Sequence, residues 1–310
     1  MTIRMHGLTS LAAAAFFASA LASTPAKAQL WTWTKDQLVE YTKAWTGDRF
    51  DDGRPKVPDA WIARAKGLSS EEVTIPGGRG GGGGYTQYEG DFKVLHPDMK
   101  MAGRVVTMSF MPPRADLDAV VAAKARDKGI ALGNQYVFDM LQPGDVLAVD
   151  LYGKKEGGTV VGDNLFYYIM KATKAGGLVV DGAFRDLDGI ADMGMPCYYR
   201  AVHPSYLTQA TASLAAVNVP IRIGNVTVMP GDLAVGDKEG VSFIPPQNVQ
   251  QILDASDTTH IHDEWTRMMF DTGKYKSTEI YSSPRDPALR QQYQDYLKKR
   301  LDEIHAQQPK

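Results

Sequence analysis

Two short stretches of this sequence place charged side chains where elements of secondary structure are expected to end or begin. The first is GGLVVDGAFRD, residues 176–186, an apolar run that ends in Arg185 followed by Asp186. Branched apolar residues between glycines are typical of a short strand buried on both faces. Neighbours within a strand point to opposite faces of the sheet. Both charges can therefore reach one ligand only if the strand has already ended, and Gly182 is its expected end.

The second stretch, VVGDN, places Gly162, Asp163 and Asn164 where an amphipathic helix is expected to begin. The first amides of a helix have no partner inside the helix and lie at the positive end of its dipole, so they bind anions such as carboxylates. When a helix is followed by a parallel strand, the start of the helix and the end of the strand meet at the same edge of the sheet. We therefore expect the two stretches to face each other.

That edge would combine an anion-binding turn, the guanidinium of Arg185 and the carboxylates of Asp163 and Asp186. An arginine grips a carboxylate or an enolate with two hydrogen bonds. A carboxylate beside it suits a hard divalent cation whose remaining ligands are waters. Two simpler interpretations stay open at this point: Asp163 as the cap of its helix, and Arg185 with Asp186 as a salt bridge in a loop. The residues alone indicate a small-anion, metal-assisted site.

The elements that must position these residues follow one another as in an α/β protein. From 92 to 250, segments with the pattern of strands alternate with amphipathic helices, which predicts an α/β core. Before the core, residues 32–72 predict a helical arm. The glycine-rich tract at 76–87 lacks the GK[ST] ending of a phosphate-binding loop and is interpreted as a flexible linker. Residues 260–308 predict charged helices that form a surface tail or an oligomer contact.

Composition and the first residues limit the class of protein. The chain has 310 residues, of which 44% are hydrophobic and 23% charged, as in an ordinary globular protein. Its net charge is −2, and it has no basic cluster of the kind that binds nucleic acid. A basic start, an apolar run at 8–23 too short to span a bilayer and small residues up to Ala28 predict a signal peptide cleaved after Ala28. We therefore expect a secreted, periplasmic protein without a membrane span after cleavage.

The other residues that could do chemistry give weaker patterns. His260 and His262 lie two apart in a predicted helix, where they do not share a face, so this stretch is interpreted as a solvated helix start rather than a metal site. Cys197 is the one cysteine of the sequence, and its apolar neighbours favour a buried structural thiol over a nucleophile. Structural roles are expected for the rest: turns for His96, His203, Asp237 and Glu239, helix packing for Phe166, Tyr167 and Tyr168, and attachment of the arm to a partner surface for Trp31, Trp33 and Trp45.

Four stretches, taken in order, resemble the RraA-like family, which includes the class II 4-hydroxy-4-methyl-2-oxoglutarate aldolases. They are GDVLAVD, GDNL, GGLVVDGAFRD and PGDLAVGDKEGVSFIP, and they follow one another without large gaps across roughly 92–250. The family opens one helix with a glycine, an acidic residue and two amide donors, and ends the next strand with the pattern dGxxRD. The matching residues are Gly162, Asp163, Asn164 and Leu165, followed by Asp181, Gly182, Arg185 and Asp186.

This resemblance implies roles for the matching residues. In the aldolase branch, the residue matching Asp186 holds a divalent metal, usually Mg²⁺ and otherwise an ion such as Mn²⁺, partly through water. The residue matching Arg185 contacts the oxygens of the oxo acid, and the amides matching Asn164 and Leu165 hold its carboxylate. The acid matching Asp163 positions a water for proton transfer. The RNase-E-inhibitor branch lacks the Arg–Asp pair in this form, so its presence implies the enzymes.

The resemblance also implies a fold and an arrangement of the chain. The expected fold is α/β, of the RraA-like swivelling β/β/α type, with a single core domain at 92–254. A signal peptide at 1–28 and a helical arm with its glycine-rich linker at 29–91 precede the core, and a helical extension at 255–310 follows it. Because family members form trimers or hexamers, a homo-oligomer is expected.

The predicted function is a divalent-metal-dependent carbon–carbon lyase acting on small 2-oxo acids. It would cleave 4-hydroxy-2-oxo acids or decarboxylate acids like oxaloacetate, in both cases giving pyruvate, with Arg185 and Asp163 as catalytic residues. Two alternatives stay open: a non-catalytic protein that binds a small carboxylate or regulates a partner, and a metal-assisted hydratase or hydrolase.

Overall fold

The fold is built on one mixed sheet, as the computed structural model shows for residues 32–74, 87–127, 133–208, 210–281 and 283–307. Among these residues the sheet has nine strands in the order β1-β11-β10-β3-β4-β5-β6-β2, and β7 also pairs with β3. The strands are β1 (Tyr88–Glu89), β2 (Lys93–Val94), β3 (Met101–Met111), β4 (Asp145–Lys154), β5 (Gly177–Phe184), β6 (Cys197–Val202), β7 (Ser213–Val217), β10 (Leu233–Gly236) and β11 (Val241–Ile244), and a separate hairpin consists of β8 (Ile221–Ile223) and β9 (Val226–Val228).

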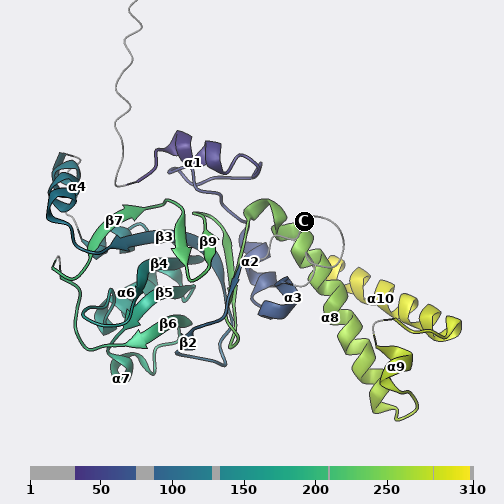
Figure 1. Cartoon of the computed structure of the whole chain (residues 1–310). Helices are drawn as coiled ribbons and strands as arrows, with labels where there is room; N and C mark the ends of the chain where they lie inside the picture. Colours follow the sequence, from purple (N-terminus) through teal and green to yellow (C-terminus); the bar gives the residue numbers. More distant parts are fainter. Residues whose placement is uncertain (1–31, 75–86, 128–132, 209, 282, 308–310) are drawn as a thin grey trace, which may run out of the picture.

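Helices accompany the sheet at both ends of the chain and between the central strands (Figure 1). They are α1 (Lys35–Tyr41), α2 (Asp59–Ala65), α3 (Ser70–Thr74), α4 (Ala115–Asp127), α5 (Asn134–Phe138), α6 (Asp163–Thr173), α7 (Leu187–Ile190), α8 (Val249–Asp271), α9 (Ser277–Ile280) and α10 (Pro287–Gln307), with a 3₁₀ turn, η2 (Pro246–Asn248), before α8. The predicted mixed α/β fold is therefore confirmed.

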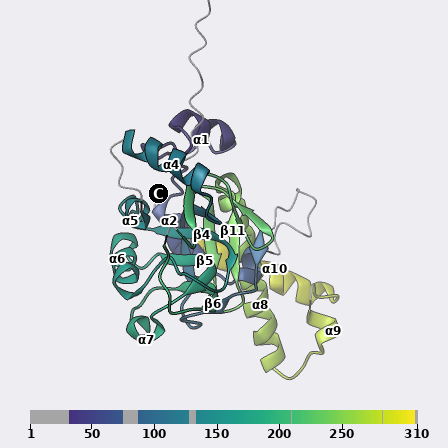
Figure 2. The ribbon, with the colours of Figure 1, turned by 60° about the vertical axis from the view of Figure 1, so that its left-hand side comes forward.

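The four central strands β3, β4, β5 and β6 are parallel neighbours, so their carboxyl ends meet at one edge of the sheet. Every residue of β5 is buried, which agrees with its unbroken apolar sequence. Helix α6 buries Phe166, Ile169 and Thr173, which lie three and four residues apart and so form one face of the helix. This face packs into the core on one side of the sheet, with residues of α4, α5 and α7. Figure 2 shows these helices along the same side.

The opposite side of the sheet is covered by the β8–β9 hairpin, whose Ile221, Ile223 and Val228 pack against central-strand residues such as Val146 and Val179. The layers are thus helices, sheet and hairpin. Because both faces of β5 are covered, polar side chains of this strand must either pair inside the protein or leave at its end.

The segment before the glycine-rich tract is packed into the core and does not stand apart as an arm. Val57, Ile62 and Leu68 form a cluster with residues of β10 and with Val249 and Leu253 of α8. The predicted attachment to a partner surface is wrong for Trp45, which is buried inside the protein and meets Trp61 edge-on with ring centroids 6.2 Å apart. Trp33 is half-buried and stacks on Tyr41 with ring centroids 4.6 Å apart, and its attachment to a partner stays a prediction.

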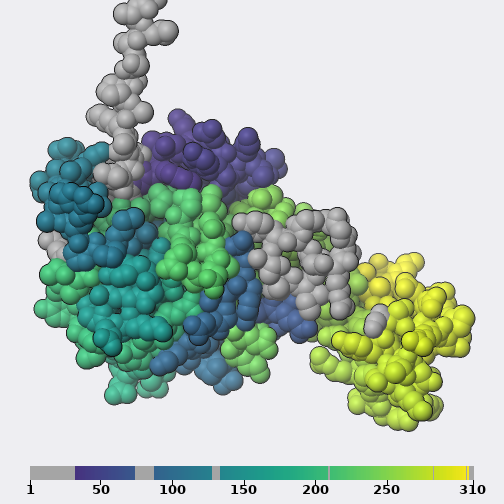
Figure 3. All heavy atoms as spheres, in the orientation of Figure 1, coloured from purple at the N-terminus to yellow at the C-terminus, as the bar shows by residue number. Residues whose placement is uncertain are grey.

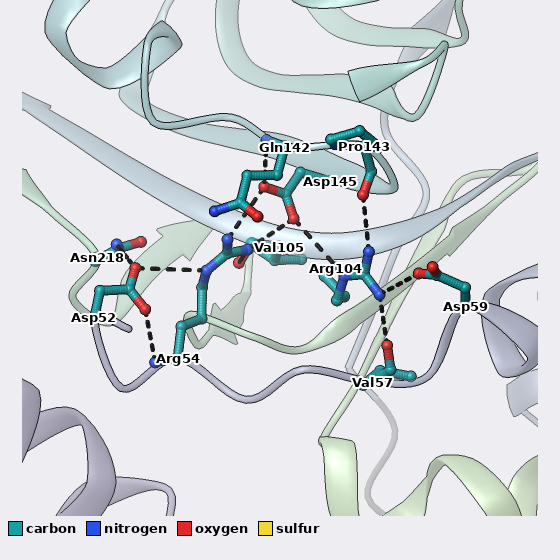
Figure 4. Close-up of polar contacts among 10 residues, drawn as sticks. All are labelled: Asp52, Arg54, Val57, Asp59, Arg104, Val105, Gln142, Pro143, Asp145 and Asn218. Atoms are coloured by element: carbon teal, nitrogen blue, oxygen red, sulfur yellow. Dashed lines mark hydrogen bonds and ion pairs between the residues drawn. The ribbon is translucent and has the colours of Figure 1, made fainter. Parts of the chain in front are cut away.

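A buried ion pair fixes this segment to the starts of the central strands (Figure 4). Arg54 and Asp145, the first residue of β4, are 1% and 0% exposed. Two parallel hydrogen bonds join them, Nη1–Oδ1 at 2.9 Å and Nη2–Oδ2 at 3.1 Å. The amide of Gln142 also donates to Asp145, and Arg104 of β3 donates to the carbonyl of Val57. The pair therefore lies at the edge of the sheet opposite the carboxyl ends of the parallel strands.

The C-terminal helices form a lobe beside the sheet, visible at the right of Figure 3. The far half of α8 contributes Trp265 and Met269 to a small core that it shares with Ile280 of α9 and with Leu289 and Tyr293 of α10. Helix α8 begins on the sheet and runs through residue 254, the expected core boundary, without a break. No helix of the described residues is long and apolar enough to cross a bilayer.

Several expectations fall outside the described residues and stay predictions. They are the signal peptide at 1–28 with its cleavage after Ala28, most of the glycine-rich tract at 76–87, and the position of Trp31. The expected homo-oligomer also stays a prediction.

We expect Arg54→Met to lower the free energy of unfolding by about 3–5 kcal/mol, because the substitution leaves the carboxylate of Asp145 buried without its main partner. Chemical denaturation followed by tryptophan fluorescence measures this change. Arg114→Met is the matched control, since Arg114 pairs with Asp116 at the surface, where both side chains are more than two thirds exposed. An Arg54→Met protein as stable as the control would contradict a structural role for the pair.

Candidate functional site

The two predicted stretches meet at the carboxyl edge of the parallel strands. Arg185 and Asp186 follow β5 directly, and Asp163 is the first residue of α6. The Nε atom of Arg185 donates to Oδ2 of Asp186 at 3.1 Å, and the backbone amide of Asp163 donates to the same oxygen at 3.3 Å. The start of the helix and the end of the strand are therefore joined through one carboxylate.

The expected end of the strand at Gly182 is wrong, because β5 continues to Phe184. Arg185 and Asp186 converge for a different reason: Asp186 has φ 60° and ψ 36°, a left-handed conformation that turns the chain sharply into α7. Gly182 is needed for packing instead. A Cβ atom there would lie 2.7 Å from the side chain of Leu151 on β4.

Arg185 is held on its other side by Thr159. Its Nη1 donates to Oγ1 of Thr159 at 3.1 Å, and that hydroxyl donates to the carbonyl of Ser205 at 3.0 Å. Thr159 is 1% exposed, whereas the side chain of Arg185 keeps 21% of its surface accessible. The guanidinium is thus fixed by two neighbours and still presents part of its edge to a ligand.

The start of α6 contradicts the interpretation of Asp163 as the cap of its helix. The N-cap is Gly162, and Asp163 is the residue after it, so Asp163 does not cap the helix. Its Oδ1 accepts a hydrogen bond from the amide of Asn164 at 2.7 Å. In this conformation the Asn164 amide, which the resemblance assigns to the substrate carboxylate together with the amide of Leu165, is occupied by the protein's own carboxylate.

A cavity of about 540 Å³ opens beside these residues, so the Arg185–Asp186 pair is accessible to a ligand. Asp163, Arg185 and Asp186 line it, together with residues of α7 and of the turn after β6. Asp188 and His203 also line it, although neither was predicted as a site residue. His203 follows β6, the parallel neighbour of β5, and its amide donates to the carbonyl of Phe184. Its place directly after the next parallel strand was a signal that could have found it.

The charges of this cavity fit a hydrated divalent cation. Asp163, Asp186 and Asp188 give its wall more negative than positive side chains. Both protein hydrogen bonds to the Asp186 side chain go to Oδ2, so Oδ1 has no partner among the described residues. No three His, Cys, Asp or Glu side chains of the described chain converge as a protein-only metal cage requires. One or two carboxylates with several retained waters is the usual arrangement for Mg²⁺.

Other candidate residues lie elsewhere. Asp181, the first residue of the pattern dGxxRD, is 2% exposed and accepts hydrogen bonds from Arg200 at 2.8 Å and from the amide of Gly224 at 3.1 Å. It therefore connects β5 to β6 and to the β8–β9 hairpin. His260 and His262 lie in the middle of α8, so their interpretation as a helix start is wrong. His260 contacts Glu72, and His262 packs between Tyr281 and Tyr293.

The remaining structural expectations have mixed outcomes. Cys197 is fully buried, and burial raises the pKa of its thiol, as expected for a structural cysteine. Asp237 and Glu239 lie in the turn between β10 and β11, and Asp237 accepts hydrogen bonds from Ser70. Of the three aromatics in α6, only Phe166 is buried, while Tyr167 and Tyr168 are nearly half exposed.

Comparison with known proteins gives one family match that covers more than half of the chain. The model of the RraA-like family, described as Aldolase/RraA, matches residues 78–242. This range includes α6, β5 and every residue described above for the site.

Curated relatives match over shorter stretches. A protein of Halalkalibacterium halodurans named "Putative 4-hydroxy-4-methyl-2-oxoglutarate aldolase" is 30% identical over 122 residues, which are 39% of this chain and 56% of that protein. A protein of Ectopseudomonas mendocina with the same name is 34% identical over 109 residues, 34% of this chain and 64% of that protein. The chain thus spans less than two thirds of the length of each of these relatives.

Solved structures share the fold. The Streptomyces coelicolor protein RraAS2, described as an unusual member of the RNase ES inhibitor RraA protein family, is 29% identical with a TM-score of 0.59, covering 70% of this chain and 100% of that protein. An uncharacterised Pseudomonas syringae protein is 19% identical with a TM-score of 0.57, covering 71% of this chain and 96% of that one. The second likeness concerns the fold alone.

Gly162 allows the charged pair to lie against the start of α6. A Cβ atom on Gly162 would lie 2.5 Å from both Nη2 of Arg185 and Oδ2 of Asp186, and the φ of −116° is open to alanine. We therefore expect Gly162→Ala to fold normally but to displace both side chains.

Calorimetric titration with oxalate in a magnesium buffer measures the consequence, and we expect at least a tenfold loss of affinity with an unchanged thermal midpoint. Gly194→Ala is the matched control, because a Cβ atom at Gly194 meets nothing within 4 Å. Full oxalate affinity in Gly162→Ala would show that the pair does not form the binding site.

Proposed function

This chain belongs to the RraA-like family, and on that premise we propose that it is a divalent-metal-dependent carbon–carbon lyase that cleaves small 2-oxo acids to give pyruvate. The observation that carries the proposal is the Arg185–Asp186 pair held against the start of α6 beside a cavity with excess negative charge. The names of the aldolase relatives support the same reaction class.

Different residues of the cavity would have different roles in such a reaction. Asp186 would hold the cation through its carboxylate and through water. When bound, a divalent cation polarises the carbonyl of a 2-oxo acid that chelates it. Arg185 lies next to Asp186 and keeps part of its edge accessible, so it can donate hydrogen bonds to the carboxylate and carbonyl oxygens of the substrate.

Cleavage of a 4-hydroxy-2-oxo acid breaks the bond between C3 and C4. The hydroxyl on C4 loses its proton and becomes the carbonyl of the leaving aldehyde or ketone, and the electrons of the broken bond form the enolate of pyruvate. Negative charge then gathers on the C2 oxygen, where the guanidinium of Arg185 stabilises it. Protonation of C3 completes the reaction, so the proton taken from the hydroxyl is returned to carbon.

Asp163 is the residue we assign to this proton transfer, acting through a water. Its carboxylate lines the cavity from the opposite element to Arg185, and one of its oxygens holds the amide of Asn164. General acid–base catalysis through a positioned water is a common role for aspartate. A Schiff-base mechanism has no support in this cavity, since no lysine is among the described residues that line it.

A second candidate function is a regulatory protein that binds a small carboxylate without converting it. It is favoured by one observation, the structural likeness to RraAS2, which is described as a member of an RNase inhibitor family. The two candidates differ in a single measurable property, the release of pyruvate.

We expect the purified protein to release pyruvate from at least one of a panel of 2-oxo acids in a lactate-dehydrogenase-coupled assay, and EDTA to abolish the release. Arg185→Ala and Asp186→Ala should each lower kcat/KM by about 10²–10³-fold or more, as expected when a partner of the enolate is removed. Far-ultraviolet circular dichroism checks that both variants are folded.

Arg285→Ala is the control for this experiment, because Arg285 is exposed in the C-terminal lobe and also precedes an aspartate. Binding of oxalate without turnover of any acid would favour the regulatory protein. Wild-type rates in Arg185→Ala would contradict the mechanism.

A further inference from the structure

A second cavity, of about 580 Å³, adjoins the carboxylate-lined cavity at Arg185. Arg185 lines both. In the second cavity it is accompanied by Thr159, which accepts a hydrogen bond from its Nη1, and by Leu165 from the first turn of α6. A molecule bound to the guanidinium is therefore within reach of this cavity.

The wall of the second cavity combines polar side chains with apolar ones, and the apolar ones lie mainly on regular elements. Phe110 of β3 and Leu214 of β7 are 4% and 8% exposed, and these two strands pair directly. Val121 and Ala122 of α4 and Val160 add to the apolar part of the wall, while polar side chains such as Asn134 and Ser213 line the rest. Side chains packed into strands and helices keep their positions, so this wall offers a preformed surface for an apolar group.

The charged side chains of the same wall disfavour a second carboxylate on the ligand. Apart from Arg185, no lysine or arginine is among the described residues that line this cavity, whereas Asp118 lines it with a carboxylate. An anionic tail would lose its hydration and meet a like charge, and both effects raise its free energy.

From this geometry we infer that the enzyme is selective for 2-oxo acids whose tail is bulky and apolar, such as an aryl group on C4. The inference rests on the proposed function, since it assigns the oxo-acid head to the carboxylate-lined cavity and the tail to the second one. This preference would distinguish the chain from its aldolase relatives, whose named substrate is a dicarboxylate. A single methylene in an apolar pocket already changes kcat/KM by about 10-fold or more.

Three substrates that all yield pyruvate test the inference: 4-hydroxy-2-oxo-4-phenylbutanoate, 4-hydroxy-2-oxopentanoate and 4-hydroxy-4-methyl-2-oxoglutarate. We expect kcat/KM for the phenyl substrate to exceed that for the other two by at least tenfold. Ala122→Phe should remove most of this preference by filling the cavity, with less than a threefold change for the pentanoate. Ala115→Phe, at the exposed start of α4, is the matched control. Equal values for the phenyl substrate and the pentanoate, or a preference for the glutarate, would overturn the inference.

A binding experiment separates this inference from the proposed function. If no substrate releases pyruvate, the lyase proposal fails, and calorimetry with phenylpyruvate and pyruvate then tests the second cavity by itself. We expect phenylpyruvate to bind at least tenfold more tightly than pyruvate in the wild type and in Ala115→Phe, but not in Ala122→Phe. Equal affinities in the wild type would overturn the assignment of the cavity.

Discussion

The contact between Gly162 and the Arg185–Asp186 pair is the constraint on which the site depends. Two charged side chains can lie against the first turn of a helix only where no side chain fills that space, and a Cβ atom at Gly162 would occupy it. The left-handed turn at Asp186 then directs its carboxylate back to the amide of Asp163. One glycine and one turn thus join two elements into a single charged surface, and Arg185 lines both the carboxylate-lined cavity and the second cavity beside it.

The sheet separates this site from the interaction that anchors the N-terminal segment. Strand β4 begins at Asp145, where Arg54 forms its buried pair, and β4 and β5 run in parallel from that edge towards the site. A buried pair of this kind is weak support for net stability, but breaking it leaves an unpaired charge. Its effect here is to fix the segment around Arg54 to the strand starts, so that the opposite edge is left for ligands.

Much of this arrangement could be predicted from local sequence. The apolar run of β5 and the glycine before α6 indicated a strand end and a helix start at one edge, and these two ends do meet. The end of β5 was misplaced because Gly182 serves packing against Leu151, which depends on a residue 31 positions away. The pair of Arg54 with Asp145 was missed because the two residues are 91 positions apart, and no local pattern records such a contact. His203 was missed although it directly follows the next parallel strand, and Asp188 lies only two residues beyond the predicted pair.

The most direct test of the account is a crystal structure of the protein with magnesium and oxalate. We expect oxalate to lie within hydrogen-bond distance of the Arg185 guanidinium, with the metal ion and its waters beside the carboxylate of Asp186. Oxalate or metal ordered elsewhere, with the Arg185–Asp186 pair unchanged, would contradict the assignment of this edge of the sheet as the active site.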